Sequence, residues 1–121
     1  MFSAILKTLV DSTPGAIGAL FLDYEGETVA LQSERPFEIA DEDLKIIGAH
    51  QGILLTQLRR LCEKSDVGEP RRFKLDFAKV RVLSLYLMDG YYIVLIVDPA
   101  ASEALAWRQM SHCRDALLAE L

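Results

Sequence analysis

Apolar residues near the amino terminus recur with the spacing of an amphipathic helix. Phe2, Ile5, Leu6, Leu9 and Val10 stand at positions i, i+3, i+4, i+7 and i+8, which places them on one face of a helix. The run Asp-Ser-Thr-Pro-Gly that follows predicts the end of this helix, because proline disfavours helical geometry in the residue before it and glycine allows a turn.

The next two segments have the patterns of strands joined by a tight turn. Residues 16–22 are apolar at every position, as in a central strand that is covered on both faces. Residues 28–32 predict a shorter strand, and the sequence Asp-Tyr-Glu-Gly-Glu between the two segments supplies turn chemistry. We therefore predict a β-hairpin over these two segments.

A long helix is predicted over residues 41–64. Asp41 can cap its first turn, and the acidic residues that follow suit the positive end of the helix dipole. On a helical wheel one apolar face is expected to pack on a sheet. This face consists of Leu44, Ile47, Leu54, Leu55, Leu58, Leu61 and Cys62.

Three strands with short connections are predicted after this helix, over residues 71–77, 80–88 and 91–98. Asp89-Gly90, between the last two strands, is a strong signal for a two-residue hairpin turn.

The chain is predicted to close with a helix over residues 101–121, after Pro99 ends the sheet. The apolar stripe of this helix consists of Ala106, Met110, Cys113 and Leu117, widened by Trp107 and Leu118. The order of elements is thus α-β-β-α-β-β-β-α. We predict one domain over residues 1–121, an α/β sandwich of the α+β kind, with an antiparallel sheet flanked by helices on both faces.

Length, charge and cysteine content limit the classes of protein. A chain of 121 residues, 51% of them hydrophobic, builds one core and leaves apolar side chains for an interface. The net charge of −5 argues against electrostatic binding to nucleic acid or to an anionic membrane. We find no signal peptide, and no apolar run approaches the roughly 20 residues of a membrane-spanning helix. Cys62 and Cys113 favour core thiols in a reducing compartment, so we expect a cytoplasmic protein.

Catalytic and metal-binding motifs are missing from the sequence. His50 and His112 fall on different predicted helices, without the spacing of a zinc site. Neither a phosphate-binding loop nor a nucleophile elbow occurs, and the paired carboxylates lie at a helix start and a hairpin turn. We therefore expect no enzyme activity, no metal and no cofactor.

The outer side of the long helix gives the first indication of a partner. A second apolar stripe there consists of Ile46, His50, Ile53 and Gln57, bordered by Ala49 and by the small pair Gly48 and Gly52. Interior glycines cost about 1 kcal/mol each, but a Gly-x-x-x-Gly spacing lets another helix approach closely. We interpret this stripe as a helix-to-helix dimer contact. The alternative is that the glycines fit against a bulky core residue and the isoleucines are scattered surface residues.

The third predicted strand gives an independent indication of self-association. Its polar and apolar residues alternate, and its polarity suits a sheet edge. If two copies pair antiparallel about a two-fold axis through Leu75, Phe73 lies opposite Phe77 of the other copy. Lys74 then lies opposite Asp76, twice, and each opposite-charge pair contributes about 0.2–1 kcal/mol. A register centred on Lys74 sets like charges opposite each other, and the alternative to both is a charged edge that discourages association.

These features together resemble the roadblock/LC7 family. The resemblance covers essentially the whole chain and rests on its length, the order of its elements and three segments: Asp-Tyr-Glu-Gly at residues 23–26, the Gly-Ala-x-x-Gly segment of the long helix, and Asp-Gly-Tyr-Tyr-Ile-Val at residues 89–94. It implies a profilin-like, five-stranded antiparallel sheet, with the long helix on one face and the terminal helices on the other. It also implies dimers formed by edge-strand pairing and by packing of the long helices.

The resemblance also implies a function. Members of this family are non-catalytic regulators or scaffolds for Ras-like small GTPases, or dynein light chains, and one bacterial roadblock dimer is a GTPase-activating partner. We therefore expect a homodimer that binds a small GTPase and modulates its nucleotide cycle or localisation. The family has no strict site motif, so partner-binding residues are chosen from the rim of the paired long helices: His50, Gln57, Arg60, Glu63 and Lys64. The alternative is a small-molecule sensor of the PAS or profilin-like type, which needs a cavity.

Overall fold

The computed structural model of the protein describes residues 1–34 and 39–121. The predicted order α-β-β-α-β-β-β-α is confirmed, and no strand boundary differs from the prediction by more than two residues. The elements are α1 (Phe2–Asp11), β1 (Ala16–Leu22), β2 (Thr28–Ser33), α2 (Asp41–Ser65), β3 (Arg72–Asp76), β4 (Arg81–Tyr86), β5 (Tyr92–Val97) and α3 (Glu103–Leu118).

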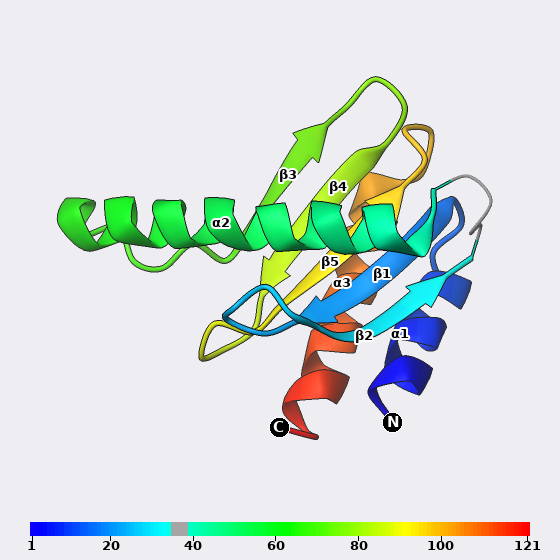
Figure 1. Ribbon diagram of the computed structural model, residues 1–121, viewed down its shortest axis with the longest axis horizontal. Coiled ribbons are helices and arrows are strands. Elements are labelled where there is room, and N and C mark those ends of the chain that lie inside the picture. The colour runs from blue at the N-terminus through cyan, green and yellow to red at the C-terminus, as the bar shows by residue number, and fades with distance from the viewer. Residues whose placement is uncertain (35–38) are drawn as a thin grey trace.

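The five strands form one antiparallel sheet in the order β2-β1-β5-β4-β3. α2 crosses one face of the sheet, and α1 and α3 cover the other (Figure 1). β1 and β5 are the second and third strands and are buried at every position, which explains their unbroken apolar sequence. The predicted fold class is therefore confirmed, and β2 and β3 are the two edges.

The turn between β4 and β5 has the geometry that its sequence predicts. Asp89 and Gly90 both have positive φ, at 51° and 85°, and the amide of Tyr91 donates to the carbonyl of Met88 at 2.8 Å. Positive φ at both central residues is what a type I′ turn requires, and the Leu87 amide also donates to the Tyr91 carbonyl at 2.8 Å, so Leu87 and Met88 both lie opposite Tyr91 as in a bulge. Gly90 tolerates this backbone because it has no Cβ.

The last helix contributes its predicted apolar stripe to the core between the sheet and the terminal helices. Ala106, Met110, Cys113 and Leu117 are the buried residues of α3, as expected. Burial raises the pKa of the Cys113 thiol to about 12, which keeps this side chain protonated and unreactive.

The N-cap of α2 differs from the prediction. Ala40 is the N-cap residue, Asp41 is already helical, and no side chain caps the first turn. The prediction that Asp41 caps this helix is therefore wrong. The three acidic residues of the first turn still lie at the positive end of the helix dipole.

The face of α2 that packs on the sheet also differs from the prediction. The buried residues of α2 are Leu44, Gly48, Gln51 and Leu55, whereas Leu61 is 60% exposed and Cys62 is partly exposed. The two faces differ because the helix lies very close to the sheet at its glycines and then continues beyond the sheet after Leu55. Gly48 and Gln51 are therefore buried against the sheet, although neither belongs to the predicted apolar face.

Gly48 and Gly52 are the residues that allow this close approach. A Cβ at Gly48 would lie 3.0 Å from the Cδ2 atom of Leu22, and a Cβ at Gly52 would collide with the Tyr92 hydroxyl. That hydroxyl is buried and donates to the Gly48 carbonyl at 3.0 Å. Both glycines therefore fit against bulky core residues, which is the alternative stated above, and their predicted place in a close helix-to-helix crossing is corrected.

We predict that Gly52→Ala destabilises the fold, although alanine is the better helix former by about 1 kcal/mol. The new methyl group overpacks the contact with Tyr92, at a cost of about 1–3 kcal/mol. Tyr92→Phe alone should cost about 1 kcal/mol through the lost hydrogen bond, and it should also remove most of the collision.

A double-mutant cycle by urea denaturation measures this coupling. Gly52→Ala should cost much less in the Tyr92→Phe background than in the parent, with a coupling of about 1 kcal/mol. Thr8→Ala, at an exposed position of α1 on the other face of the sheet, should show no coupling with Gly52→Ala. Additive costs for the first pair would contradict this account of the glycine.

Candidate functional site

α2 extends well beyond the sheet that supports its first half. Its last buried side chain is Leu55, yet the helix continues for ten further residues to Ser65, a length of roughly 15 Å. Figure 1 shows this end projecting past the β3 edge. The projecting end therefore presents most of its surface to solvent or to another molecule, while Leu58, Arg59 and Cys62 are half-buried.

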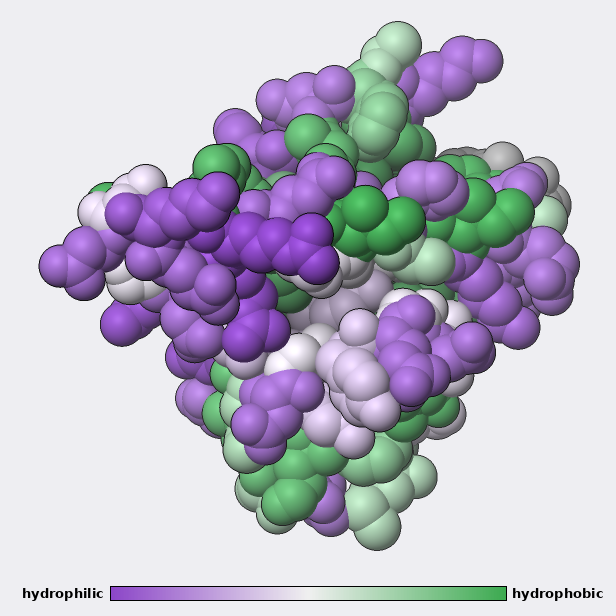
Figure 2. All heavy atoms as spheres, turned by 60° about the vertical axis from the view of Figure 1, so that its left-hand side comes forward, coloured by the Kyte–Doolittle hydropathy of each residue, from purple (hydrophilic) through white to green (hydrophobic). Residues whose placement is uncertain are grey.

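The outer stripe of α2 is apolar and exposed, as predicted. Ile46 and Ile53 are 56% and 55% exposed, and His50 and Gln57 between and beyond them are also exposed. The His50 ring nitrogen Nδ1 lies 2.9 Å from the Ile46 carbonyl. Figure 2, in which the side with the projecting helix end comes forward, shows hydrophobic patches among hydrophilic side chains.

Ala49, at the border of the stripe, lies on the flank of the helix. It is partly buried, and its backbone faces the turn between β1 and β2, where a Cβ at Gly26 would lie 3.6 Å from its Cα atom. Of the predicted dimer residues on α2, the isoleucines therefore face outward, the glycines face the sheet, and Ala49 lies between them.

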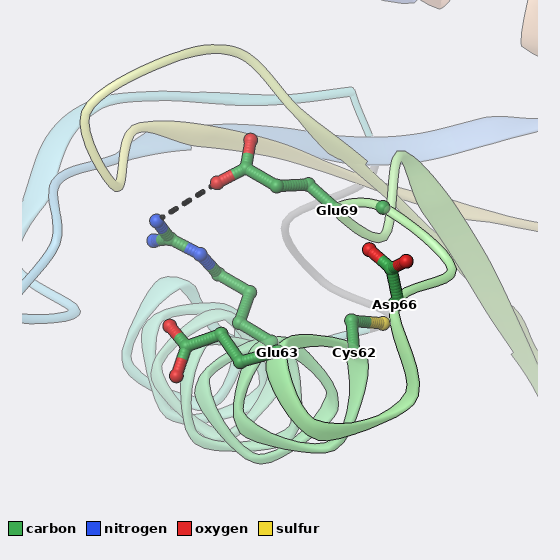
Figure 3. A pocket seen from close by; sticks show the side chains of 6 residues that line it. Cys62, Glu63, Asp66 and Glu69 are labelled. Carbon is green, nitrogen blue, oxygen red and sulfur yellow. Dashed lines mark hydrogen bonds and ion pairs between the residues drawn. The ribbon is translucent and has the colours of Figure 1, made fainter.

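Arg60, Glu63 and Lys64 are exposed on the projecting end of α2. Next to them the loop after the helix folds back, and Glu69 accepts a hydrogen bond from Arg59 at 3.3 Å (Figure 3). The Arg59 guanidinium also lies 5.0 Å from the centre of the Tyr86 ring. The hollow that Figure 3 shows is therefore crossed by an ion pair that holds the loop against the helix.

Two further apolar residues of this end are missing from the sequence-based site. Leu61 is 60% exposed and Val67, in the loop, is 73% exposed. The helical wheel assigned Leu61 to the sheet face, because a wheel holds no information on where the supporting sheet stops. The length of the helix compared with the width of the sheet is the signal that would have identified them.

The apolar side of β3 is only partly covered. Phe73 and Leu75 are half-buried and Phe77, just beyond the strand, is 54% exposed. Phe73 packs at the margin of the core beneath α2, and the alternation of strand side chains places the other two on the same face. The exposed edge strand and the projecting helix end therefore offer apolar side chains on one face of the sheet.

The hydrogen bonds to β4 show which backbone groups of β3 are free to pair. The Arg71 carbonyl accepts from the Tyr86 amide, and the Phe77 amide donates to the Val80 carbonyl, both at 2.9 Å. Odd-numbered residues of β3 therefore pair with β4, and the amides and carbonyls of Arg72, Lys74 and Asp76 point away from it. An added antiparallel strand would bond to these three residues.

The polar side of β3 faces α3 and carries a charge network. Lys74 Nζ lies 3.0 Å from Glu103 Oε2, and Arg81 bridges Asp76 at 2.6 Å and Glu103 at 3.4 Å. The hydrogen bond from Arg81 lowers the pKa of Asp76, and the hydrogen bonds from Lys74 and then from Trp107 lower that of Glu103. Both carboxylates are thus held in their charged form.

The two histidines do not converge on one site. The sheet separates His50 on α2 from His112 on α3, and within residues 1–34 and 39–121 no three His, Cys, Asp or Glu side chains are grouped as a metal site. Among the helices of the described segments, none is both long and apolar enough for a membrane span. What the site offers is exposed apolar surface beside a strand edge.

Comparisons with known proteins identify the fold. No protein-family model and no curated protein matches the sequence. Among solved structures, a roadblock/LC7 domain from Streptomyces avermitilis aligns over 98% of this chain and 95% of its own, with 13% identity and a TM-score of 0.86. Myxococcus xanthus MglB aligns over 96% and 90%, with 15% identity and a TM-score of 0.83.

A third structure, MglC from Myxococcus xanthus, aligns over 99% of this chain and 98% of its own, with 22% identity and a TM-score of 0.68. The structures similar to this chain are thus roadblock/LC7 domain proteins, MglB among them. The resemblance that the sequence suggests is confirmed at the level of the fold.

Proposed function

We propose that this chain is a non-catalytic, cytoplasmic homodimer that docks a Ras-like small GTPase and modulates its nucleotide cycle or its localisation. The observation that carries the proposal is the exposed apolar stripe on a helix of a roadblock/LC7 fold. Ile46 and Ile53 are each more than half exposed, because they lie on the side of α2 that faces away from the sheet. Exposed apolar surface of this kind marks a protein contact.

Self-association through β3 follows from three features of that edge. Its outward backbone groups are free to bond, its apolar side is half-covered, and α2 projects past it on the same face. Antiparallel pairing of two β3 strands would carry each projecting helix end over the other copy. An MglB structure with this fold has a tetrameric arrangement, which shows that such a domain can associate with itself.

The structure limits the registers open to two paired β3 strands. Because even-numbered residues point outward, the two-fold axis must pass through a residue and not between two residues. The Leu75-centred register satisfies this condition and places Lys74 opposite Asp76. These side chains already neighbour Glu103 and Arg81 within one chain, so pairing would join two charge networks with alternating signs.

We predict that Ile53→Asp shifts the protein towards the monomer. A carboxylate without a partner in an apolar helix contact costs a few kcal/mol, which is at least a hundredfold in the dimer dissociation constant. Sedimentation velocity at micromolar concentration measures the shift. Met88→Asp, at an exposed apolar position in the β4–β5 turn, is the matched control and should remain dimeric. An Ile53→Asp protein that sediments like the parent would contradict the helix contact.

The register is tested by cross-linking in a Cys62→Ser background. Residues at the two-fold axis are directly opposite, with Cβ atoms about 4.5–5.5 Å apart, close to the separation that a disulfide needs. Leu75→Cys should therefore form a covalent dimer under mild oxidation, and Phe73→Cys should not. Efficient cross-linking of Lys74→Cys instead would place the axis at Lys74 and reject the proposed register.

The GTPase is expected to bind the groove between the paired long helices, at the rim that includes the projecting end of α2. His50 and Gln57 are polar and exposed, and in the proposed dimer they would lie at this rim, so they are suited to fix the orientation of a bound protein. His50→Ala and Gln57→Ala should each weaken binding about tenfold, or about 1.4 kcal/mol, and leave the melting temperature and the dimer unchanged.

Calorimetry with the small GTPases of the same organism, each loaded with GDP or with a non-hydrolysable GTP analogue, measures this loss. His112→Ala and Gln109→Ala change the same residue types on α3, beyond the sheet, and should leave the affinity unchanged. Equal losses for both pairs of variants would reject the α2 surface, and a dimer that binds none of these GTPases would reject the function.

A further inference from the structure

A second surface lies on the opposite side of the sheet from the α2 stripe, where α3 passes beside β3. Six residues line a shallow groove there: Arg72, Glu103, Ala104, Trp107, Arg108 and Ser111. We call it the arginine-tryptophan groove. Its side chains lie outside the predicted dimer contact at residues 73–77 and outside the proposed GTPase surface, although the backbone of Arg72 belongs to the same β3 edge.

The aromatic ring at the centre of this groove is held in place by hydrogen bonds, and an arginine stacks on it. The Trp107 indole N–H donates to Glu103 at 3.2 Å, and the Ser111 hydroxyl donates to the Trp107 carbonyl at 3.0 Å. The Arg72 guanidinium lies over the ring, 4.6 Å from its centre. Stacking of this kind leaves the in-plane N–H donors of the guanidinium free and fixes their direction.

The groove has positive charge that the chain itself does not balance. Its one carboxylate, Glu103, is already paired with Lys74 and Arg81. Among the described residues no carboxylate oxygen lies within 4.0 Å of a side-chain nitrogen of Arg72 or Arg108. Two arginines with an aromatic platform therefore remain open to an anionic ligand.

Acidic and basic residues are also unevenly distributed along the chain. The first 43 residues hold nine of the 18 acidic residues and two of the 13 basic ones, whereas residues 59–81 alone hold eight of the basic ones. Residues 59–81 also hold four acidic residues, so the segment that contains β3 has an excess of four positive charges in a protein whose net charge is −5. An acidic ligand is attracted to the side with this basic segment and repelled by the other.

We propose that the arginine-tryptophan groove binds an acidic segment of a partner protein. Arg72 and Arg108 donate hydrogen bonds to carboxylates of that segment, and its apolar parts contact the Trp107 ring. The net negative charge of the whole chain disfavours a long polyanion such as nucleic acid, whereas a short acidic segment meets only the basic side. This site acts independently of GTPase docking.

Trp107 is the sole tryptophan of the chain and thus reports directly on the groove. The probe is a fluorescein-labelled dodecapeptide of alternating glutamate and alanine, with its glutamine counterpart as the uncharged control. In 50 mM salt the glutamate peptide should give saturable anisotropy and a change in tryptophan emission measured with the unlabelled peptide. Both signals should weaken at least fivefold in 300 mM salt, and the glutamine peptide should give neither.

Substitutions distinguish binding in the groove from general electrostatic attraction. Arg72→Gln should weaken binding at least fivefold, and Arg72→Lys should fall between it and the parent, because lysine keeps the charge without the planar fork. Arg60→Gln changes net charge equally on α2 and should bind like the parent, and Ile53→Asp should too. Thermal melts confirm that each variant is folded.

Four results would overturn the proposal. They are equal losses for Arg60→Gln and Arg72→Gln, binding of the glutamine peptide, tighter binding of a ten-base oligothymidine, or no saturable binding of the acidic peptide. None of them bears on the GTPase measurements, which use the other face of the sheet.

Discussion

The close contact between α2 and the centre of the sheet determines what the rest of the molecule can present. Gly48 and Gly52 bring the helix onto the sheet, and the buried Tyr92 hydroxyl bonds to the helix backbone there. Burial raises the pKa of Tyr92 to about 12, so the hydroxyl remains a donor. With this anchor in place the outer stripe must face away from the core, and the end of the helix must project past β3.

Most of the fold was accessible from the sequence because its signals are local. The uninterrupted apolar run of β1, the Asp89-Gly90 turn and the stripe of α3 each specify one element through neighbouring residues, and all three are confirmed. The helix start at Asp41 was predicted correctly, but its cap was not, because Ala40 caps the helix without a side-chain hydrogen bond. A sequence pattern cannot reveal such a cap.

The candidate site was only partly accessible, because its geometry depends on contacts between distant residues. Gln51 is buried although it is polar, since the Ser84 hydroxyl on β4 donates to it at 3.1 Å. Such a partner 33 residues away cannot be seen on a helical wheel. Arg72 and Trp107 are likewise distant in sequence and form the arginine-tryptophan groove only because β3 and α3 lie side by side.

The unsupported last third of α2 has a consequence for how such a protein could be controlled. Backbone hydrogen bonds there are shielded by no sheet of the same chain, so a lone copy should fray at this end and a paired copy should not. Under the proposed pairing, the docking surface would become complete only as copies meet. Protein abundance would then set how much of that surface exists in the cell, without any chemical modification of the chain.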